Sequence, residues 1–364
     1  MKVLVVGLGG IGQRHVRNLR TLLGADCEIL AYRVRGLSRT ITPQLGVDAG
    51  KCVETEYNLK IFSDLDAALA QLPEVAFVCN PTSLHASTAI ACARAGCDLF
   101  IEKPLSHSLD GLEALIEACE VRKRIAMVGY QLRFHPCLKQ LQAVLQNGDI
   151  GRVLAVRAQV CEYLPNWHPY EDYRQMYAAR SDLGGGVVLS QIHEFDYLYS
   201  LFGLPKRVFA VGGHSSQLEI DVEDVASVLM ESVVDGRVLP IHLHQDYLQC
   251  PPTRECEVIG EDGKVTANFA KLEVTLCSRG GTSSVWTFPN FERNQLFIGE
   301  LKYFLNCVTT RIRPMVDVQA GLQSLRMALA AKQSMACGHS VELAPDGADD
   351  SRSQEFHSAS VTHV

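Results

Sequence analysis

The first third of the chain alternates short apolar runs with longer stretches in which apolar residues recur every three or four positions. Such alternation is typical of parallel strands joined by crossover helices. The apolar runs predict strands at residues 3–6, 27–32, 75–79 and 99–101. Helices are predicted at residues 11–23 and 82–95, and after a capping pair at Ser63 and Asp64. The pattern therefore predicts a doubly wound parallel α/β sheet.

A further helix is predicted after Pro104. Apolar side chains recur there at three- and four-residue spacing, at Leu109, Leu112, Ile116 and Cys119. This spacing places them on one side of a helix, so we expect that side to be buried.

Beyond residue 150 the pattern changes to segments rich in β-branched residues, at 153–160, 208–212, 226–234, 237–244 and 255–259. Asp235 with Gly236, and Glu261 to Gly263, have the composition of hairpin turns. Two helical stretches follow, at residues 295–309 and 318–335. The sequence thus predicts a first domain over residues 1–128, an α+β domain with an open, mostly antiparallel sheet over 129–343, and a flexible tail over 344–364.

Composition narrows the class of protein. Apolar residues make up 47% of the chain and charged residues 21%, which is typical of a folded globular protein. The net charge of −7 gives no general attraction to nucleic acid or to anionic lipid, so we expect neither as a partner. The apolar run at the N-terminus is too short for a signal peptide or a membrane span.

The cysteines indicate a reducing compartment. There are 13 of them, an odd number, and no two are spaced as C-x-x-C. This disfavours both disulfides and a structural zinc site, so we predict a cytoplasmic protein and no metal. His242, His244 and Asp246 alternate along a predicted strand and give a weak metal signal, which we interpret as surface or substrate-facing side chains.

A glycine-rich turn follows the first strand and opens the first helix. It runs Gly7, Leu8, Gly9, Gly10, Ile11 and Gly12. In this context the G-x-G-x-x-G pattern predicts a dinucleotide-binding Rossmann domain. Gly7 permits the tight turn, Gly9 lets the backbone approach a pyrophosphate, and Gly12 lets the helix pack on the strand. We therefore assign Gly7, Gly9, Gly10, Ile11 and Gly12 to cofactor binding.

The end of the second strand lacks the acidic residue that binds the ribose of NAD. Arg33 and Arg35 stand there instead. Guanidinium groups can bind a 2′-phosphate through two charge-assisted hydrogen bonds, so the cofactor is NADP or NAD, with NADP favoured. The alternative is that both arginines face solvent.

Three further segments complete a recognisable set: Cys79 to Thr82, the Glu102, Lys103 and Pro104 triplet, and Gly129 to Phe134. Together with the glycine turn they resemble the Gfo/Idh/MocA oxidoreductases over nearly the whole chain. The resemblance implies hydride transfer between a nicotinamide and a hydroxyl carbon, by a homodimer or homotetramer. It also implies that Lys103 contacts cofactor and substrate, and it adds further cofactor residues: Asn80, Pro81, Thr82, His85, Glu102 and Gln131, with Arg133 toward the substrate.

A glycine run, Gly184 to Gly186, precedes the predicted catalytic segment. Family members carry an acid followed three residues later by a histidine, and here those positions hold Ser190 and His193. Imidazole titrates near neutral pH and can accept a hydroxyl proton, whereas serine cannot act alone as a base. We predict that His193 is the general acid and base. Lys103 polarises the substrate hydroxyl or relays its proton, and Ser190 only hydrogen-bonds the substrate.

An aromatic and charged segment at residues 162–174 is richer than a connector needs. Aromatic faces stack on sugar rings, and charged groups bind hydroxyls or carboxylates. We therefore predict a substrate wall, with an ordinary packed loop or an oligomer contact as the alternatives. Its predicted substrate residues are Tyr163, Trp167, Asp172, Tyr173 and Arg174.

The sequence as a whole predicts an NAD(P)-dependent oxidoreductase acting on a sugar, sugar acid or sugar nucleotide, by resemblance in the synthesis of a surface-polysaccharide precursor. One alternative is an enzyme with tightly bound cofactor that cleaves or epimerises a glycoside through transient oxidation. Another is a dinucleotide-binding protein without catalysis. This last alternative is favoured by Ser190, which stands in place of the acid.

Overall fold

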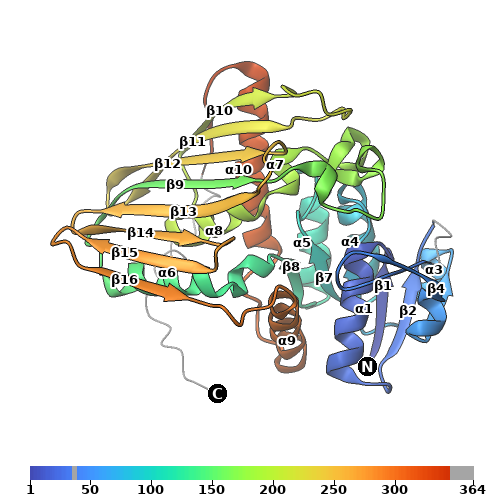
Figure 1. The fold of residues 1–364 in the computed structure, drawn as a ribbon. Helices are drawn as coiled ribbons and strands as arrows, with labels where there is room; N and C mark the ends of the chain where they lie inside the picture. The colour runs from blue at the N-terminus through green and yellow to red at the C-terminus, as the bar shows by residue number, and fades with distance from the viewer. Residues whose placement is uncertain (35–38, 345–364) are drawn as a thin grey trace.

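The computed structural model describes residues 1–34 and 39–344, and it is built on two large sheets (Figure 1). The N-terminal sheet has six parallel strands in the order β5-β2-β1-β6-β7-β8. This is the strand order of a Rossmann domain, and it confirms the predicted doubly wound sheet. The strands are β1 (Lys2–Val6), β2 (Glu28–Tyr32), β5 (Leu59–Phe62), β6 (Val75–Val78), β7 (Asp98–Glu102) and β8 (Ala126–Gly129).

The crossover segments hold the helices α1 (Gly10–Leu23), α2 (Val53–Glu56), α3 (Leu65–Leu69), α4 (His85–Arg94) and α5 (Leu112–Val121), with a small hairpin of β3 (Arg39–Ile41) and β4 (Val47–Cys52). The predicted cap is confirmed, because the Asp64 side chain accepts a hydrogen bond from Ala67 N. The prediction for Leu109 is wrong: α5 begins only at Leu112, and the Leu109 side chain is 50% exposed.

The second sheet has nine strands in the order β16-β15-β14-β13-β9-β12-β11-β10-β17. Its neighbours pair antiparallel except β9 with β12, which are parallel, so the predicted α+β class is confirmed. The strands are β9 (Val153–Cys161), β10 (Arg207–Gly213), β11 (Val225–Val234), β12 (Arg237–Asp246), β13 (Thr253–Gly260), β14 (Gly263–Asn268), β15 (Glu273–Ser278), β16 (Ser283–Thr287) and β17 (Val341–Glu342).

Among residues 1–34 and 39–344, helices pack against one face of this sheet (Figure 1). They are α6 (Pro136–Asn147), α7 (Val187–Ser190), α8 (His193–Phe202) and α10 (Val318–Cys337). Residues of β12 alternate accordingly, with Leu239, Ile241 and Leu243 buried beneath the helices. The opposite face carries the more exposed side chains and is not covered by any helix in the described part of the chain; it is called the open face below.

Helix α9 (Asn294–Thr310) follows the last long strand of the second sheet, β16, and packs on the first sheet. Its Leu301 and Phe304 are buried in the same core cluster as Phe77 and Phe100 of the parallel sheet. The Phe304 ring meets Phe100 edge to face at 5.4 Å. A helix late in the sequence thus completes the core of the N-terminal sheet, and this fixes the two sheets against each other. No helix in residues 1–34 and 39–344 is long and apolar enough to cross a membrane.

Candidate active site

The glycine turn between β1 and α1 has the backbone that the sequence predicts. Gly7 has a φ of +95°, and a Cβ added there would lie 2.8 Å from the Cys79 carbonyl oxygen. A Cβ on Gly12 would lie 2.0 Å from the carbonyl oxygen of Gly7. By contrast, a Cβ on Gly9 would meet nothing within 4 Å. The free side of the turn therefore adjoins the start of α1, where backbone N–H groups and the helix dipole favour an anion such as a pyrophosphate.

Tyr170, which no sequence pattern marks as a cofactor residue, covers this turn. A Cβ on Gly10 would lie 2.5 Å from the Tyr170 hydroxyl oxygen. The Arg39 guanidinium donates to the Tyr170 carbonyl oxygen at 3.2 Å and lies 5.6 Å from the centre of its ring. The His168 ring stacks on the Tyr170 ring, with 5.1 Å between the ring centres. Part of the aromatic segment therefore lies against the nucleotide-binding turn.

Of the two arginines predicted to bind the ribose phosphate, the structure describes only Arg33. Arg35 lies outside the described residues. Arg33 follows β2, and its guanidinium contacts the Glu54 carboxylate of α2. An acidic group thus lies beside the one described arginine at the position where a 2′-phosphate would bind.

Asn80, Pro81 and Thr82 follow β6 and lead into α4 through a 3₁₀ turn (Thr82–Leu84). The Asn80 amide nitrogen donates to Thr88 Oγ1 at 2.9 Å. Its Oδ1 atom is buried and has no hydrogen-bond partner in the described part of the chain. A buried acceptor without a partner is costly, so this oxygen fits a donor on a bound ligand, such as a ribose hydroxyl.

The His85 side chain bridges the two turns that follow β6 and β7. Its Nδ1 lies 2.7 Å from the Pro104 carbonyl oxygen and its Nε2 lies 2.8 Å from that of Asn80. Burial lowers the pKa of His85, while the two carbonyl groups favour its protonated form. The ring therefore holds the Lys103 and Pro104 turn against the turn that follows β6.

Lys103, directly after β7, is held by the end of α7, which follows the glycine run at Gly184 to Gly186. Its ammonium nitrogen donates to the Ser190 carbonyl oxygen at 2.7 Å. The neighbouring Glu102 carboxylate faces α1 and lies 2.6 Å from His15 Nε2 in a buried pair. Consecutive residues of a strand point to opposite faces. Glu102 therefore binds α1 on one face, and the Lys103 side chain points away from α1 toward the second domain.

His193 is the first residue of α8, and its side chain is buried. The Tyr130 ring meets it edge-on at 5.7 Å, and among the described residues nothing hydrogen-bonds its Nδ1. Burial lowers the pKa of His193 well below its ordinary value, and the positive charges of Lys103 and Arg254 lower it further. The imidazole is therefore neutral near pH 7 and can accept a proton.

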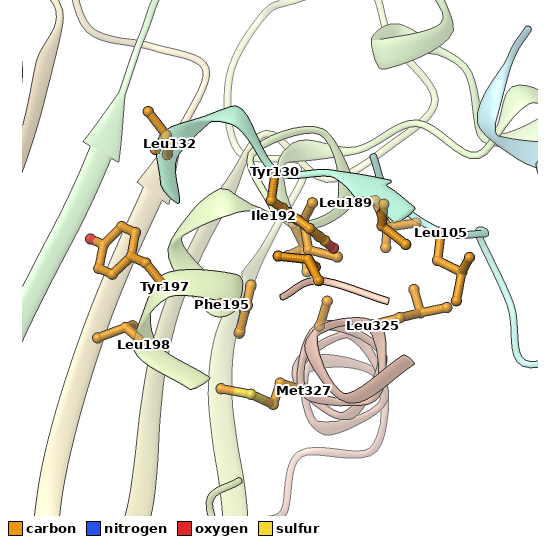
Figure 2. Packing of buried hydrophobic residues seen from close by; sticks show 14 of the residues in the cluster. Leu105, Tyr130, Leu132, Leu189, Ile192, Phe195, Tyr197, Leu198, Leu325 and Met327 are labelled. Carbon is orange, nitrogen blue, oxygen red and sulfur yellow. The ribbon is translucent and has the colours of Figure 1, made fainter. Parts of the chain in front are cut away.

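Apolar packing fixes the segment between Ser190 and His193. Figure 2 shows Leu189 and Ile192 packed close to Tyr130 in the buried cluster. Ile192 and Tyr130 have no exposed surface. A segment held in this way has little freedom to move, so the positions of Lys103, Ser190 and His193 are set together.

Arg133 is engaged in an ion pair with α8. Its guanidinium donates to the two carboxylate oxygens of Asp196 at 2.6 Å and 2.9 Å. The Asp196 side chain is buried and also accepts a hydrogen bond from Ser324 Oγ. The contacts of Arg133 are thus internal, and its predicted role toward the substrate stays a prediction. Gln131, in the same 3₁₀ turn (Gln131–Phe134), is half-buried.

The rest of the aromatic segment divides into separate parts. Trp167 packs edge-on against Tyr247 at 5.2 Å, and Tyr163 is 38% exposed. Arg174 pairs with Asp172 at 2.8 Å, and it also pairs with Glu219 at 2.7 Å. The structure therefore brings Lys103, Ser190 and His193 together. Arg174 and Tyr173 contact Glu219 instead, whose backbone N donates to the Tyr173 hydroxyl at 3.2 Å, and Asp172 is held through Arg174.

Comparison with known proteins identifies the class. Residues 1–130 match the model of the oxidoreductase family with an NAD-binding Rossmann fold. Residues 138–266 match the model of the GFO/IDH/MocA C-terminal domain. The chain therefore belongs to the Gfo/Idh/MocA family and is an NAD(P)-dependent oxidoreductase, as the sequence resemblance implied.

Named relatives are similar along almost the whole chain. Myo-inositol 2-dehydrogenase of Thermotoga maritima is 28% identical over 357 residues, which cover 94% of this chain and 98% of that protein. The scyllo-inositol 2-dehydrogenase (NAD(+)) of Bacillus subtilis is 26% identical over 353 residues, 94% of this chain and 96% of the relative. A Bordetella pertussis dehydrogenase crystallised with NADH and UDP-GlcNAcA shares the fold, with a TM-score of 0.74, 22% identity and coverage of 95% and 99%.

Proposed function

We propose that this chain oxidises or reduces one hydroxyl-bearing carbon of a sugar, sugar acid, cyclitol or sugar nucleotide. The observation that carries the proposal is geometric: the Lys103 ammonium, just after the carboxyl end of β7, donates to the Ser190 carbonyl oxygen at 2.7 Å, and the buried His193 imidazole lies three residues further along the chain. Ligands of open α/β sheets bind at these carboxyl ends. The relatives named as inositol dehydrogenases support a polyhydroxylated substrate.

The residues divide the chemistry between them. When bound, the nicotinamide supplies the hydride acceptor or donor. In the oxidative direction His193 accepts the proton of the substrate hydroxyl, and the Lys103 ammonium stabilises the negative charge that develops on that oxygen. In the reductive direction His193 returns the proton. The Gly7 to Gly12 turn and Asn80 hold the cofactor, and Tyr170 covers the turn.

Ser190 changes the charge of the site relative to the family pattern. Lys103 is bonded to the carbonyl oxygen of Ser190, which is neutral, at 2.7 Å. A carboxylate in this segment would oppose the lysine charge, whereas the carbonyl leaves it intact. Burial and then the positive charge of Lys103 lower the pKa of His193, so we propose that His193 serves as the base without an acidic residue at position 190.

The test is an absorbance assay with purified protein. NAD and NADP are each incubated with a panel of inositols, aldoses, uronic acids and UDP-sugars, and formation of the reduced nicotinamide is followed. We expect turnover with at least one member of the panel. Bound cofactor that never changes its redox state across the panel would reject the proposal and favour a non-catalytic dinucleotide-binding protein.

The pH dependence of oxidation follows from the state of His193. Its pKa lies well below the ordinary value of 6.5, because of burial and then the charge of Lys103. The base is neutral above this pKa and becomes protonated as the pH falls through it. We therefore expect kcat/KM for oxidation to stay level down to pH 6.5 and to fall only below it. An acid limb with its midpoint above 6.5 would contradict this assignment.

Cofactor preference is tested at Arg33. If its guanidinium binds a 2′-phosphate, Arg33→Asp will lower the affinity for NADP by about 10-fold or more, the effect of losing one charge-assisted contact. The affinity for NAD will remain or improve. Fluorescence titration of both cofactors measures the ratio, with Glu54→Gln as the control that frees Arg33 from its carboxylate partner. An unchanged ratio in Arg33→Asp would remove the preference for NADP.

Assembly and location are part of the same proposal. We propose a homodimer or homotetramer formed through the open face of the second sheet. Three apolar side chains on its strands support this: Val211 is 62% exposed, Leu229 54% and Val238 62%. Apolar exposure of this kind is typical of surfaces that bind protein. The free thiols, many of them buried, support a reducing cytoplasmic environment.

A further inference from the structure

The open face of the second sheet brings three metal-ligating side chains together. They are Cys161, the last residue of β9, and His244 and Asp246 of β12. The parallel register places Asp246 directly beside Cys161, and His244 lies two residues earlier on the same strand. Residues two apart share a face of a strand. Their thiol, imidazole and carboxylate ligand atoms all lie within 4.8 Å of one another.

Burial and hydrogen bonds hold the cluster in place. Cys161 and Asp246 are buried, while the His244 side chain is 29% exposed. His244 Nδ1 lies 2.9 Å from Ser227 Oγ, and its Nε2 lies 3.2 Å from the Asp246 carboxylate. A hydrogen bond to one ring nitrogen fixes the imidazole and aims the other nitrogen at a metal. Asp246 is oriented in turn by Leu248 N and Gln249 Nε2, at 2.9 Å and 2.7 Å.

We propose that Cys161, His244 and Asp246 form a binding site for a zinc-type divalent cation. Thiolate, imidazole and carboxylate are the ligands that Zn²⁺ takes, and three protein ligands leave a fourth tetrahedral position open to water. The soft thiolate disfavours Mg²⁺ and Ca²⁺. None of the three ligands is among the residues to which the redox chemistry is assigned.

The charges and protons balance on binding. The Cys161 thiol releases its proton to solvent and bonds to the metal as thiolate. His244 binds through Nε2 and keeps its N–H on Nδ1, toward Ser227. One thiolate and one carboxylate then neutralise the two positive charges of the ion, so the buried site carries no net charge.

The ion cross-links two strand ends that support the active site. Cys161 immediately precedes the aromatic segment that carries Tyr170, and Asp246 immediately precedes Tyr247, against which Trp167 packs. The Asp246 carbonyl oxygen also accepts a hydrogen bond from Gln191 Nε2 at 3.2 Å, next to Ser190. Bound metal therefore stabilises the segment that covers the nucleotide-binding turn.

The test uses Co²⁺ as a spectroscopic probe on the reduced full-length chain. We expect one Co²⁺ per chain, with the near-ultraviolet charge-transfer band of a thiolate ligand and the intense visible bands of tetrahedral Co²⁺, and displacement of both by Zn²⁺. Cys161→Ser abolishes the charge-transfer band. Cys277→Ser, at a half-buried thiol of the same sheet, leaves it unchanged.

A second variant covers the case in which Cys161→Ser does not fold. Ser227→Ala keeps all three ligands and removes the hydrogen bond to His244, so we expect it to lower Co²⁺ affinity by about 10- to 100-fold with the same spectrum. Absence of a thiolate band in the unmodified chain, or an unchanged affinity in Ser227→Ala, would overturn the proposal. These readouts do not depend on dehydrogenase activity.

Discussion

Replacing Lys103 by methionine, or His193 by alanine, is expected to lower kcat by about 100-fold or more. The methionine keeps most of the volume of the lysine and removes the charge that stabilises the substrate oxygen, and the alanine removes the base. Groups that transfer or stabilise a proton in the transition state contribute about 10²- to 10⁴-fold in rate. Steady-state kinetics with the substrate found in the panel measures the effect.

The control separates chemistry from binding and from folding. Lys139→Met removes an exposed lysine of α6 and should leave kcat unchanged. Dinucleotide affinity, measured by fluorescence titration, should change little in His193→Ala, because the turn at Gly7 to Gly12 is intact. Near-normal turnover in both Lys103→Met and His193→Ala would reject their catalytic roles.

Replacing Arg133 by methionine is expected to lower the free energy of unfolding by about 3–5 kcal/mol, the range for breaking a buried ion pair by removing one partner. The Asp196 carboxylate is 1% exposed and would lose both guanidinium hydrogen bonds. Because Asp196 lies one turn beyond His193 on α8, the variant should also lower kcat. Urea denaturation followed by circular dichroism measures the stability change.

A solvent-exposed pair provides the matched comparison. Arg180 and Asp182 are 41% and 58% exposed and lie 2.6 Å apart. Exposed pairs contribute about 0–1 kcal/mol, so Arg180→Met should change stability by no more than this. If Arg133→Met were as mild, the Arg133 to Asp196 pair would not anchor α8, and Arg133 would be free for the predicted substrate role.

The regular parts of the fold could be predicted because local sequence encodes them. The strands at Lys2–Val6 and Val75–Val78 are continuous apolar runs, and Asp235 with Gly236 has the positive φ values that a tight hairpin needs. Strands β14 to β16 were not predicted, since their apolar residues are few. The packing of α9 on the parallel sheet is a contact between distant segments, and no local pattern indicates it.

The same distinction applies to the candidate site. Lys103 and His193 could be found because each follows a recognisable element, a buried strand or a glycine run. The partners of Arg33 and Arg133 could not, since Glu54 and Asp196 are brought to them by the folded chain. Likewise, His244 and Asp246 gave only a weak metal signal in the sequence. Cys161 joins them through the register of β9 with β12, which no sequence spacing encodes.

The most direct test of the central claim is a crystal structure of the chain with bound NAD or NADP. We expect the pyrophosphate to lie against the turn from Gly7 to Gly12 and the nicotinamide ring to lie beside Lys103 and His193. A dinucleotide bound elsewhere, or a nicotinamide ring remote from both side chains, would contradict this claim.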